Sequence, residues 1–375
     1  MMKKNLIANR IIFIICVFNL LLYGCVPMKK PPKVTVETWW KLYKKNFILP
    51  DGRVQRPDHD FDTVSEGQAY AMIFSVFMND KKTFDLIYAW TEKHLSRNNK
   101  HGDHLLAWHW KEGSVTDFMP ASDADGDYAF ALLLASYRWK EKNYEEKALL
   151  VANDMLRLET VRGIDNRLFL LPGLWGNEKN GYLVQNPSYY SPAAFHMFYE
   201  ITKDSQWLDL IETGYWILNQ SSIVLGELKG CGLIPDWCAV DHNGKILPAE
   251  GKSSDYGWEA IRIPMRIGID KYWYNSEKAG KILEKVYQVL QTSNSSHREI
   301  KATYHYTGEP SVEYSSLASI AMTCFIAQIH NFNVDELKAL LVNKFNEESS
   351  TTNYYSQSLA FFPLAFENRI LEKPR

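Results

Sequence analysis

The stretch ASDADGDYAFALLLASYRW, at residues 121–139, decides the fold of this chain. Its second half is apolar on nearly every face, and a helix of that kind has to be buried on all sides. Three carboxylates, those of Asp123, Asp125 and Asp127, stand just before this helix. One side chain is enough for a helix cap, and Ser122 or Asp123 suits that role. Capping alone is the structural alternative, but three carboxylates indicate a functional site at the entrance of a buried helix.

Helical segments of two kinds alternate along the chain. Segments that are apolar on most faces occur at 66–78, 128–139, 191–201, 258–269, 314–329 and 354–366. Amphipathic segments occur at 36–47, 81–95, 144–160, 206–218, 276–292 and 334–345. An amphipathic helix needs only one covered wall, whereas a helix that is apolar all round needs neighbours on every side. The sequence therefore predicts an all-α fold in which six inner helices are covered by six outer helices.

An open helical solenoid is the main alternative, but no repeated motif of fixed period supports it. Strand patterns are largely absent, although the Gly- and Asp-rich segment 226–251 could hold a short hairpin. Hydrophobic residues make up 46% and aromatic residues 14% of the 375-residue chain. This composition provides a large core and flat aromatic surfaces that suit sugar rings.

The charge and the motifs argue against several classes of function. The formal net charge is −2 and no basic run follows Lys44-Lys45, so we expect no nucleic-acid partner. No pair of CxxC motifs and no HExxH motif occurs, so we expect no metal site and no cofactor. Cys231 and Cys238 could pair across a short loop, and Cys324 lies in an apolar segment that predicts a buried thiol. We expect the protein to be a monomer.

Residues 1–24 have the organisation of a secretion signal. A basic start precedes a short apolar stretch at 11–23. That stretch is too short to span a membrane comfortably. The sequence Leu22-Tyr23-Gly24-Cys25 resembles a bacterial lipobox, in which Cys25 would be the lipidated first residue of the mature protein, although Tyr23 is unusual there.

A tether and one domain are expected after the signal. Residues 25–35 are rich in proline and lysine and predict a tether, and residues 36–375 predict a single catalytic domain. A lipid on Cys25 would place this domain on the extracellular side of the bacterial cell membrane. An ordinary signal peptide, which would release the domain, and an uncleaved anchor are the alternatives.

Polar and aromatic residues gather at the start of nearly every inner helix. They are Ser65-Glu66-Gly67-Gln68, Asp123 to Asp127, Asn186 to Tyr190, Asp255 to Glu259, Glu313-Tyr314 and Tyr354-Tyr355. In a double ring these positions meet at one end, so they predict an acidic, aromatic cleft. Paired carboxylates without a metal motif favour glycoside cleavage, which needs one protonated and one ionised carboxyl group. Glu66 begins a buried helix, where burial would raise its pKa; a Glu that binds a backbone N–H is the structural alternative.

Six blocks carry a more specific signal. They are SEGQAYAM at 65–72, LLAWHW at 105–110, ASDADGDYAFALLLA at 121–135, NPSYYSPAAF at 186–195, LIPDW at 233–237 and YGWEAIRIPMR at 256–266. In this order the blocks resemble glycoside hydrolase family 8, and the resemblance covers about residues 36–366. It implies an (α/α)6 barrel and hydrolysis with inversion of configuration. The family includes endoglucanases, xylanases, chitosanases, lichenases and hydrolases that accompany exopolysaccharide synthesis.

The resemblance also implies roles for single residues. Glu66 would be the proton donor, and Asp123 would lie under the sugar at the cleavage point. Asp125 and Asp127 would support or cap the site, and Asp125 also stands among the candidate substrate-binding residues. Arg262 would keep neighbouring carboxylates ionised and is a further substrate-binding candidate; an ordinary buried ion pair is its structural alternative.

The catalytic base is where the sequence departs from its family. Many members have Asp-Ala before the arginine of the last block, but this chain has Glu259-Ala260. Glu259 is still a carboxylate, one methylene longer, and is the expected base. Some members place the base on an inserted loop, so Asp255 is the alternative, and Asp236 and Asp241 are more remote candidates.

Aromatic side chains are expected to bind the sugar rings. Trp108 is favoured by its block, and Tyr189 and Tyr190 are candidates in theirs, with core packing as the structural alternative. Trp175, Trp237 and Trp258 remain unassigned.

Two functions follow from these observations. The first is a membrane-tethered, inverting endo-glycosidase that cuts a β-1,4-linked polysaccharide, either cellulose-like or a cell-surface exopolysaccharide, as a partner of a polysaccharide synthase complex. The second is a non-catalytic lipoprotein that binds polysaccharide within an exopolysaccharide export system, because the same aromatic cleft would serve it.

Overall fold

The computed structural model describes residues 34–177, 181–295, 299–348 and 353–374. Residues from Val34 onward form one compact unit. The predicted signal peptide, Cys25 and nearly all of the tether lie outside the described residues, so they stay predictions. Within the described ranges, no helix is both long and apolar enough to cross a membrane.

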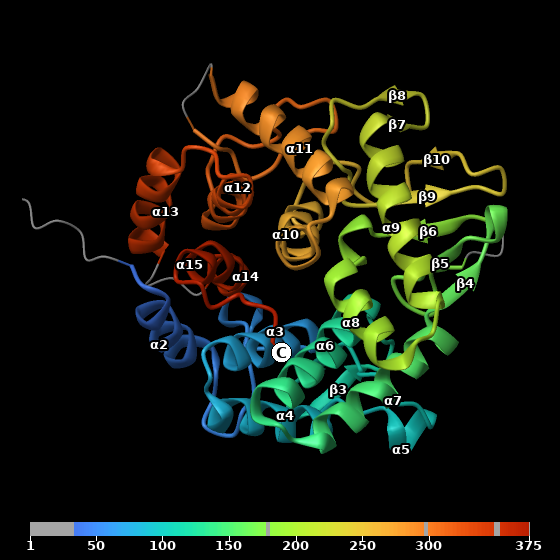
Figure 1. Cartoon of the computed structure of the whole chain (residues 1–375), viewed down its shortest axis with the longest axis vertical. Coiled ribbons are helices and arrows are strands. Elements are labelled where there is room, and N and C mark those ends of the chain that lie inside the picture. The colour runs from blue at the N-terminus through green and yellow to red at the C-terminus, as the bar shows by residue number, and fades with distance from the viewer. Residues whose placement is uncertain (1–33, 178–180, 296–298, 349–352, 375) are drawn as a thin grey trace, which may run out of the picture. The chain divides into compact units, whose positions relative to one another are not determined.

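Two concentric rings of helices build the described part of the chain (Figure 1). The inner ring consists of α3 (Ser65–Phe77), α6 (Ser122–Trp139), α8 (Pro192–Thr202), α10 (Ile263–Tyr274), α12 (Leu317–Ile329) and the pair α14 (Tyr354–Leu359) and α15 (Phe361–Glu367). The outer ring consists of α2 (Val36–Phe47), α4 (Lys81–His94), α7 (Lys142–Leu158), α9 (Gln206–Ile223), α11 (Glu277–Ser295) and α13 (Asp335–Glu348). This arrangement confirms the predicted all-α (α/α)6 barrel.

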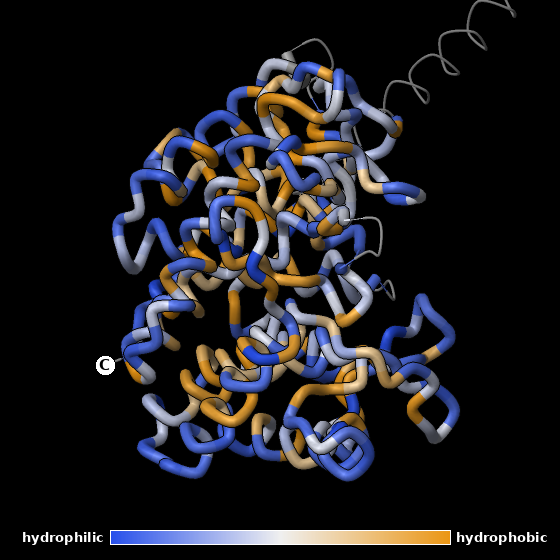
Figure 2. The backbone as a smooth tube through the Cα atoms, turned by 90° about the vertical axis from the view of Figure 1, so that its right-hand side faces the viewer, coloured by the Kyte–Doolittle hydropathy of each residue, from blue (hydrophilic) through white to orange (hydrophobic). Residues whose placement is uncertain are grey.

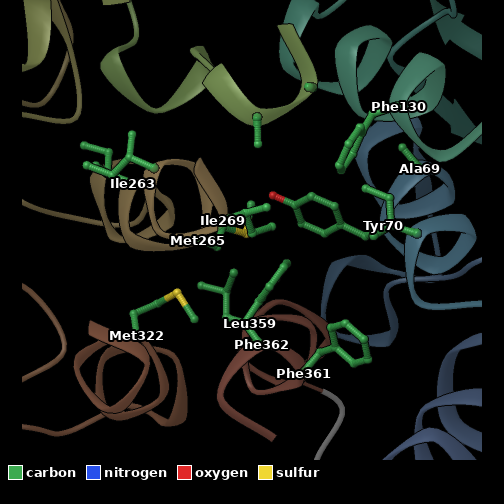
Figure 3. Packing of buried hydrophobic residues seen from close by; sticks show 14 of the residues in the cluster. Ala69, Tyr70, Phe130, Ile263, Met265, Ile269, Met322, Leu359, Phe361 and Phe362 are labelled. Atoms are coloured by element: carbon green, nitrogen blue, oxygen red, sulfur yellow. The ribbon is translucent and has the colours of Figure 1, made fainter. Parts of the chain in front are cut away.

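Burial explains why each helix takes its ring. In α6 every residue from Ser122 to Ser136 is buried, whereas α2 buries a single face that includes Trp39, Tyr43 and Phe47. Side chains from different inner helices, such as Tyr70, Met265 and Phe362, converge between them (Figure 3). Along the backbone, the hydrophilic segments lie mainly on the outside and in the loops (Figure 2). An inner helix therefore has to be apolar on all faces, as its sequence indicates.

The last inner helix is divided at Ala360 into α14 and α15. Pro363 lies in the first turn of α15, where its missing N–H group costs nothing. A proline ring also clashes with the carbonyl group four residues earlier in a continuous helix. Pro363 therefore accounts for the interruption that the sequence prediction of one helix at 354–366 missed.

Short antiparallel strands connect the helices at the end of the barrel that carries the predicted cleft. They are β1 (Thr63–Val64), β2 (His109–Lys111) and β3 (Ser114–Asp117); β4 (Thr160–Arg162) and β5 (Leu168–Leu170); β7 (Val224–Leu225) and β8 (Leu228–Lys229); and β6 (Leu183–Gln185), β9 (Cys238–Val240) and β10 (Ile246–Leu247). Val240 pairs with Ile246, so β9 and β10 form a hairpin within the segment 226–251. Thr63 pairs with Trp110, which places the loop containing Trp108 beside the start of α3.

Three sequence predictions about local structure are wrong. Helix α6 begins at Ser122 with Ala121 as its N-cap and no side-chain cap bond, so neither Ser122 nor Asp123 is the cap. Helix α10 begins at Ile263 rather than at 258, because a 3₁₀ turn, Ala260–Arg262, precedes it. Cys231 is exposed, Cys238 is buried, and both are free thiols rather than a disulfide. Cys324 is a buried free thiol, as predicted.

Candidate active site

The start of α3, the start of α6 and the turn before α10 meet around one cleft. Two adjoining cavities, of about 510 Å³ and 180 Å³, share the side chains of Arg56, Glu66, Glu259 and Arg262. The larger one is also lined by Trp258 and Tyr355, and the smaller one by Trp108, Asp123 and Tyr189. Several of the predicted cleft residues therefore come together from segments that are far apart in the sequence, whereas others, such as Glu313 and Tyr314, line neither cavity.

Arg262 joins three carboxylates at the centre of this cleft. Its Nη1 donates to Asp123 Oδ2 at 2.8 Å and to Glu66 Oε2, and its Nη2 donates to Glu259 Oε2. Nη2 also donates to Ser188 Oγ at 3.1 Å. The Arg262 side chain is only 3% exposed. One buried cation cannot neutralise three ionised carboxylates, so the cluster favours the uptake of a proton.

Glu66 is the carboxyl group that takes up this proton. Burial raises its pKa to about 7, the negative charges of Asp123 and Glu259 act in the same direction, and Arg262 opposes them. A carboxyl group with a pKa near neutrality can hold a proton and still donate it, which is what a general acid requires.

Glu259 lies on the other arm of the same guanidinium group. Its side chain is 33% exposed, more than that of Glu66 at 19%. Asn186 Nδ2 donates to Glu259 Oε2 at 3.0 Å, and the Asn186 Oδ1 accepts from the Ser188 hydroxyl at 2.7 Å. Two groups that bind opposite arms of one guanidinium lie within roughly 8 Å of each other, given ordinary hydrogen-bond lengths. Both carboxyl groups therefore face the same part of the cleft.

Asp236 supports Glu259 through the backbone. Its Oδ1 accepts the N–H groups of Gly257 and Glu259 at 3.0 Å and that of Ala260 at 2.7 Å. Burial raises the pKa of Asp236 to about 6, although these N–H groups oppose the rise. A Cβ atom on Gly257 would lie 2.3 Å from Asp236 Oδ2, so this close approach requires glycine. Asp236 therefore fixes the turn that carries Glu259.

Asp236→Asn should keep kcat within about threefold of the wild-type value, because the Asn carbonyl can accept the same three N–H groups but cannot act as a base. Asp236→Ala should lower the free energy of unfolding by about 1–3 kcal/mol, since three buried donors lose their acceptor. Steady-state kinetics and urea unfolding of both variants make the comparison. An inactive Asp236→Asn variant that still folds would identify Asp236 as the base instead.

The other two alternative bases lie away from the carboxylate cluster. Asp255 Oδ1 contacts His305 Nδ1 at 3.2 Å, and Asp255 lines neither cavity of the cleft. Asp241 accepts the backbone N–H groups of Asn243 and Lys245 in a turn, both at 2.8 Å. Neither side chain shares a contact with Glu66.

Two predicted substrate-binding residues do not reach the cleft. Asp125 is fully buried and accepts the Leu106 N–H at 2.7 Å. Successive residues of an α-helix are about 100° apart, so two residues correspond to about 200°. Asp125 therefore points away from the face that carries Asp123. Tyr190 is 1% exposed, and its hydroxyl group donates to Gln185 Oε1 at 2.7 Å. Neither Asp125 nor Tyr190 lines the cleft, so the structure gives no support to the prediction that they bind substrate.

Asp127 lies one helical turn after Asp123 and binds Arg266 Nη1 in a buried ion pair. This buried ion pair lies beneath Asp123, and the supporting role that the resemblance implies for Asp127 stays a prediction. Tyr189 does reach the cleft, where its ring lies 5.3 Å from the Arg262 guanidinium. Trp108 is 37% exposed, and its carbonyl group accepts the Ser65 N–H at 3.0 Å, directly beside Glu66.

Glu159 is a buried carboxyl group that sequence reasoning missed. It follows α7, is completely buried beside Asp125, and neither of its oxygens has a hydrogen-bond donor among the described residues. Burial raises the pKa of Glu159 well above 4.5, and Asp125 and Asp123 act in the same direction. A protonated Glu159 can share its proton with Asp125, so the pair carries one negative charge instead of two, which lowers the cost of its burial.

Glu159→Gln should be more stable than the wild type at pH 8. Since the folded state raises the pKa of Glu159 above 4.5, the folded chain holds a proton that the unfolded chain has lost, and the wild-type free energy of unfolding falls as pH rises. The free energy of unfolding of Glu159→Gln should therefore exceed that of the wild type by an amount that grows by about 1.4 kcal/mol per pH unit above pH 4.5. This difference should vanish below pH 4.5. Urea unfolding from pH 4 to 8 measures this, with exposed Glu146→Gln on α7 as the control. A pH-independent difference would contradict a buried, protonated Glu159.

Arg56 is a second arginine of the cleft that the sequence did not reveal. Its Nε and Nη2 donate to the two oxygens of Asp62 at 2.8 Å and 2.6 Å. Asp62 also binds His109 Nε2 at 2.9 Å, and the His109 ring stacks on Trp108 with 4.8 Å between centroids. These contacts fix Arg56 beside Glu66. The contacts of Arg56 depend on the pairing of β1 with β2. Strands this short give no recognisable pattern in the sequence, so this pairing could not be predicted.

Within the described residues, no group of three or more His, Cys, Asp or Glu side chains could hold a metal ion. Trp258 also lines the cleft, next to Tyr355, whose hydroxyl group donates to the Trp258 carbonyl oxygen. Trp258 and Tyr355 stand in segments that the sequence places at the cleft, whereas Arg56 adds a cleft-lining side chain that the sequence did not indicate.

Known proteins resemble the chain in sequence. The sequence profile of glycosyl hydrolases family 8 matches residues 16–369. An endoglucanase of Cellulomonas uda is 32% identical over 239 residues, which are 63% of this chain and 64% of that protein. An endoglucanase of Escherichia coli O157:H7 is 34% identical over 265 residues, which are 67% of this chain and 68% of that protein. Endoglucanase A of Acetivibrio thermocellus is matched over 50% of its length, so the chain spans about half to two thirds of such relatives.

Solved structures resemble it as well. The endo-1,4-D-glucanase of Vibrio fischeri ES114 superposes with a TM-score of 0.75 and 26% identity, over 88% of this chain and 94% of that one. The endo-beta-1,4-glucanase of Acetobacter xylinum has the same fold, with a TM-score of 0.73 and 22% identity over 89% of this chain and 98% of that one. The sequence profile covers most of the chain and confirms the resemblance that the six blocks indicate, so the chain belongs to glycosyl hydrolases family 8.

Proposed function

We propose that this protein is an inverting endo-β-1,4-glucanase in which Glu66 is the general acid and Glu259 the general base. The observation that carries the proposal is the meeting of Glu66, Asp123 and Glu259 on one buried arginine, Arg262. The names of the relatives, which include endoglucanases of several bacteria, support the choice of a β-1,4-glucan as substrate.

The reaction proceeds by a single displacement. Glu66 gives its proton to the bridging oxygen as the bond from that oxygen to the anomeric carbon breaks. A water molecule attacks the anomeric carbon from the opposite face and loses a proton to Glu259. Inversion requires about 6.5–9.5 Å between the two carboxyl groups, which leaves room for that water. Contact with the two arms of one guanidinium is compatible with this separation.

Arg262 and burial divide the work between the two carboxyl groups. Glu66 is the more buried of the two, and burial raises its pKa to about 7, so that a large share of the molecules hold this proton near neutral pH. Glu259 is more exposed and accepts hydrogen bonds from Arg262 and Asn186, which hold its carboxylate in place. Asp123 stays paired with Arg262 under the bound sugar and orients it. Acid and base therefore have different environments, as this mechanism requires.

The release of reducing ends tests the activity. The purified full chain is incubated with carboxymethylcellulose, lichenan, xylan and chitosan, and we expect new reducing ends from the β-1,4-glucans. The longer side chain of Glu259 in place of the family's Asp is the observation that favours the second candidate, a non-catalytic polysaccharide-binding protein. Folded protein that binds these polymers but releases nothing from any of them would support that candidate.

We infer from the lipobox that Cys25 tethers the protein to the extracellular side of the cell membrane, where it trims a polysaccharide as a synthase complex makes it. Cys25→Ala should move the protein from the membrane fraction to the medium. Unchanged fractionation of this variant would contradict the tether.

A further inference from the structure

An aromatic shelf leads away from the centre of the cleft. The Tyr189 ring lies over Arg262, the Trp237 ring is 5.9 Å from that of Tyr189, and the Trp175 ring is 6.0 Å from that of Trp237. Trp175 is 39% exposed. A Cβ atom on Gly173 would lie 2.9 Å from both the Trp175 indole nitrogen and the Pro120 carbonyl oxygen, so the shelf packs against the segment that leads into α6.

Lys252 places a positive charge on this shelf. Its ammonium group lies 4.9 Å from the ring centroid of Trp175 and 4.7 Å from that of Trp237. The turn that carries it is fixed, because the Lys252 N–H donates to the Ala249 carbonyl at 3.2 Å and the Trp237 N–H donates to the Ser253 carbonyl at 3.1 Å. Among the ion pairs of the described residues none includes Lys252, and its side chain is exposed.

An ammonium group over two indole rings occupies the aromatic surface that a neutral sugar ring would use. Contacts of this kind are weak at exposed sites, so a ligand can displace or recruit the lysine. A neutral sugar can accept ordinary hydrogen bonds from the ammonium group but gains no ion pair, and it has to move the side chain aside to stack on the rings. A sugar with a negative substituent can stack beside the lysine and pair with it. A shelf of this kind is suited to a sugar that carries a negative charge.

We propose that Lys252 is a specificity-determining residue that binds a negatively charged substituent of a sugar on the Trp175–Trp237 shelf. The preferred substrate is then a β-1,4-glucan that carries anionic groups, such as carboxylates. This inference rests on the proposed function, because it assigns a substrate class to the same cleft.

Two polymers with the same backbone test the inference: anionic carboxymethylcellulose and neutral hydroxyethylcellulose. Lys252→Met keeps the apolar stem and removes the charge. We expect it to raise KM for carboxymethylcellulose about threefold without changing kcat, in line with an exposed ion pair, and to leave KM for hydroxyethylcellulose equal or lower. Lys252→Arg should restore the wild-type KM. The difference should disappear near 1 M salt, where the Debye length is about 3 Å.

Lys203→Met is the matched control, because Lys203 also lies over an aromatic ring, that of Tyr199 at 5.7 Å, but at the opposite end of α8 from the cleft. It should change neither KM. An equal change on both polymers, or no change on either, for Lys252→Met would overturn the inference.

Affinity electrophoresis separates this inference from the proposed activity. Glu66→Gln protein, with and without Lys252→Met, is run in gels that contain either polymer. Weaker retardation of the double variant in the carboxymethylcellulose gel, but not in the hydroxyethylcellulose gel, supports the inference about Lys252. A wild-type protein that releases no reducing ends would contradict only the proposed activity and would leave this binding result valid. Equal retardation of both proteins in both gels counts against Lys252.

Discussion

Replacing Glu66 by glutamine is expected to lower kcat by about 10²–10⁴-fold, the contribution typical of a general acid. Glutamine has nearly the same shape and can still accept the hydrogen bond from Arg262, but it has no proton to give to the leaving oxygen. The variant should therefore fold and bind cellulose-like polymers as the wild type does. Reducing-end assays, circular dichroism and affinity electrophoresis measure the three properties.

Exposed Glu37→Gln in the first turn of α2 removes the same charge far from the cleft and should leave kcat unchanged. The pKa of Glu66 adds a second readout. A general acid works only while it is protonated, so wild-type kcat/KM should fall as the pH rises above about 7, where Glu66 loses its proton. A Glu66→Gln variant that keeps more than a tenth of the wild-type kcat would contradict the role of Glu66.

Replacing Glu259 by glutamine is expected to lower kcat by a similar factor, about 10²–10⁴-fold, because water then has no base. Its contacts with Arg262 and Asn186 can be kept by the amide oxygen, so the effect should appear in kcat rather than in stability. Glu259→Asp should retain more activity than Glu259→Gln, since a carboxylate remains although its reach is shorter by one methylene. Steady-state kinetics and thermal melts of the variants measure these effects.

Asp255→Asn is the matched comparison for Glu259→Gln, because it neutralises the alternative base on the same segment. Asp255 contacts His305 and lines neither cavity, so this variant should stay within about twofold of the wild-type kcat. The reverse pattern, in which Asp255→Asn is inactive and Glu259→Gln is active, would place the base on the loop at 255.

The double ring could be predicted from the sequence because inner and outer helices have different hydrophobic patterns. The segment 128–139 is apolar on nearly every face and is buried in α6 from Tyr128 to Ser136, whereas 36–47 shows the single apolar face that α2 buries. The exact starts of α6 and α10 could not be predicted. They depend on Ala121 as a cap and on the bonds of Asp236 to a distant turn.

The candidate site was predictable where its residues belong to recognisable blocks, as Glu66, Asp123 and Glu259 do. It was not predictable where contacts cross between loops. Arg56 reaches the cleft only because Asp62 and His109 hold it, and Lys252 meets Trp175 only through the folded turn after β10. Asp125 shows that even a recognisable block does not predict every side chain. It lies only two residues after Asp123 on the same helix, but its carboxyl group is buried in the core instead of lining the cleft.

The configuration of the first product tests the central claim most directly. Proton NMR spectra of a β-1,4-glucan, recorded within minutes of adding enough enzyme to outrun mutarotation, show which anomer forms at the new reducing end. If Glu66 and Glu259 act by a single displacement, the α-anomer appears first and the β-anomer follows by mutarotation. Initial formation of the β-anomer would indicate a covalent intermediate and retention of configuration, and would contradict the roles assigned to both residues.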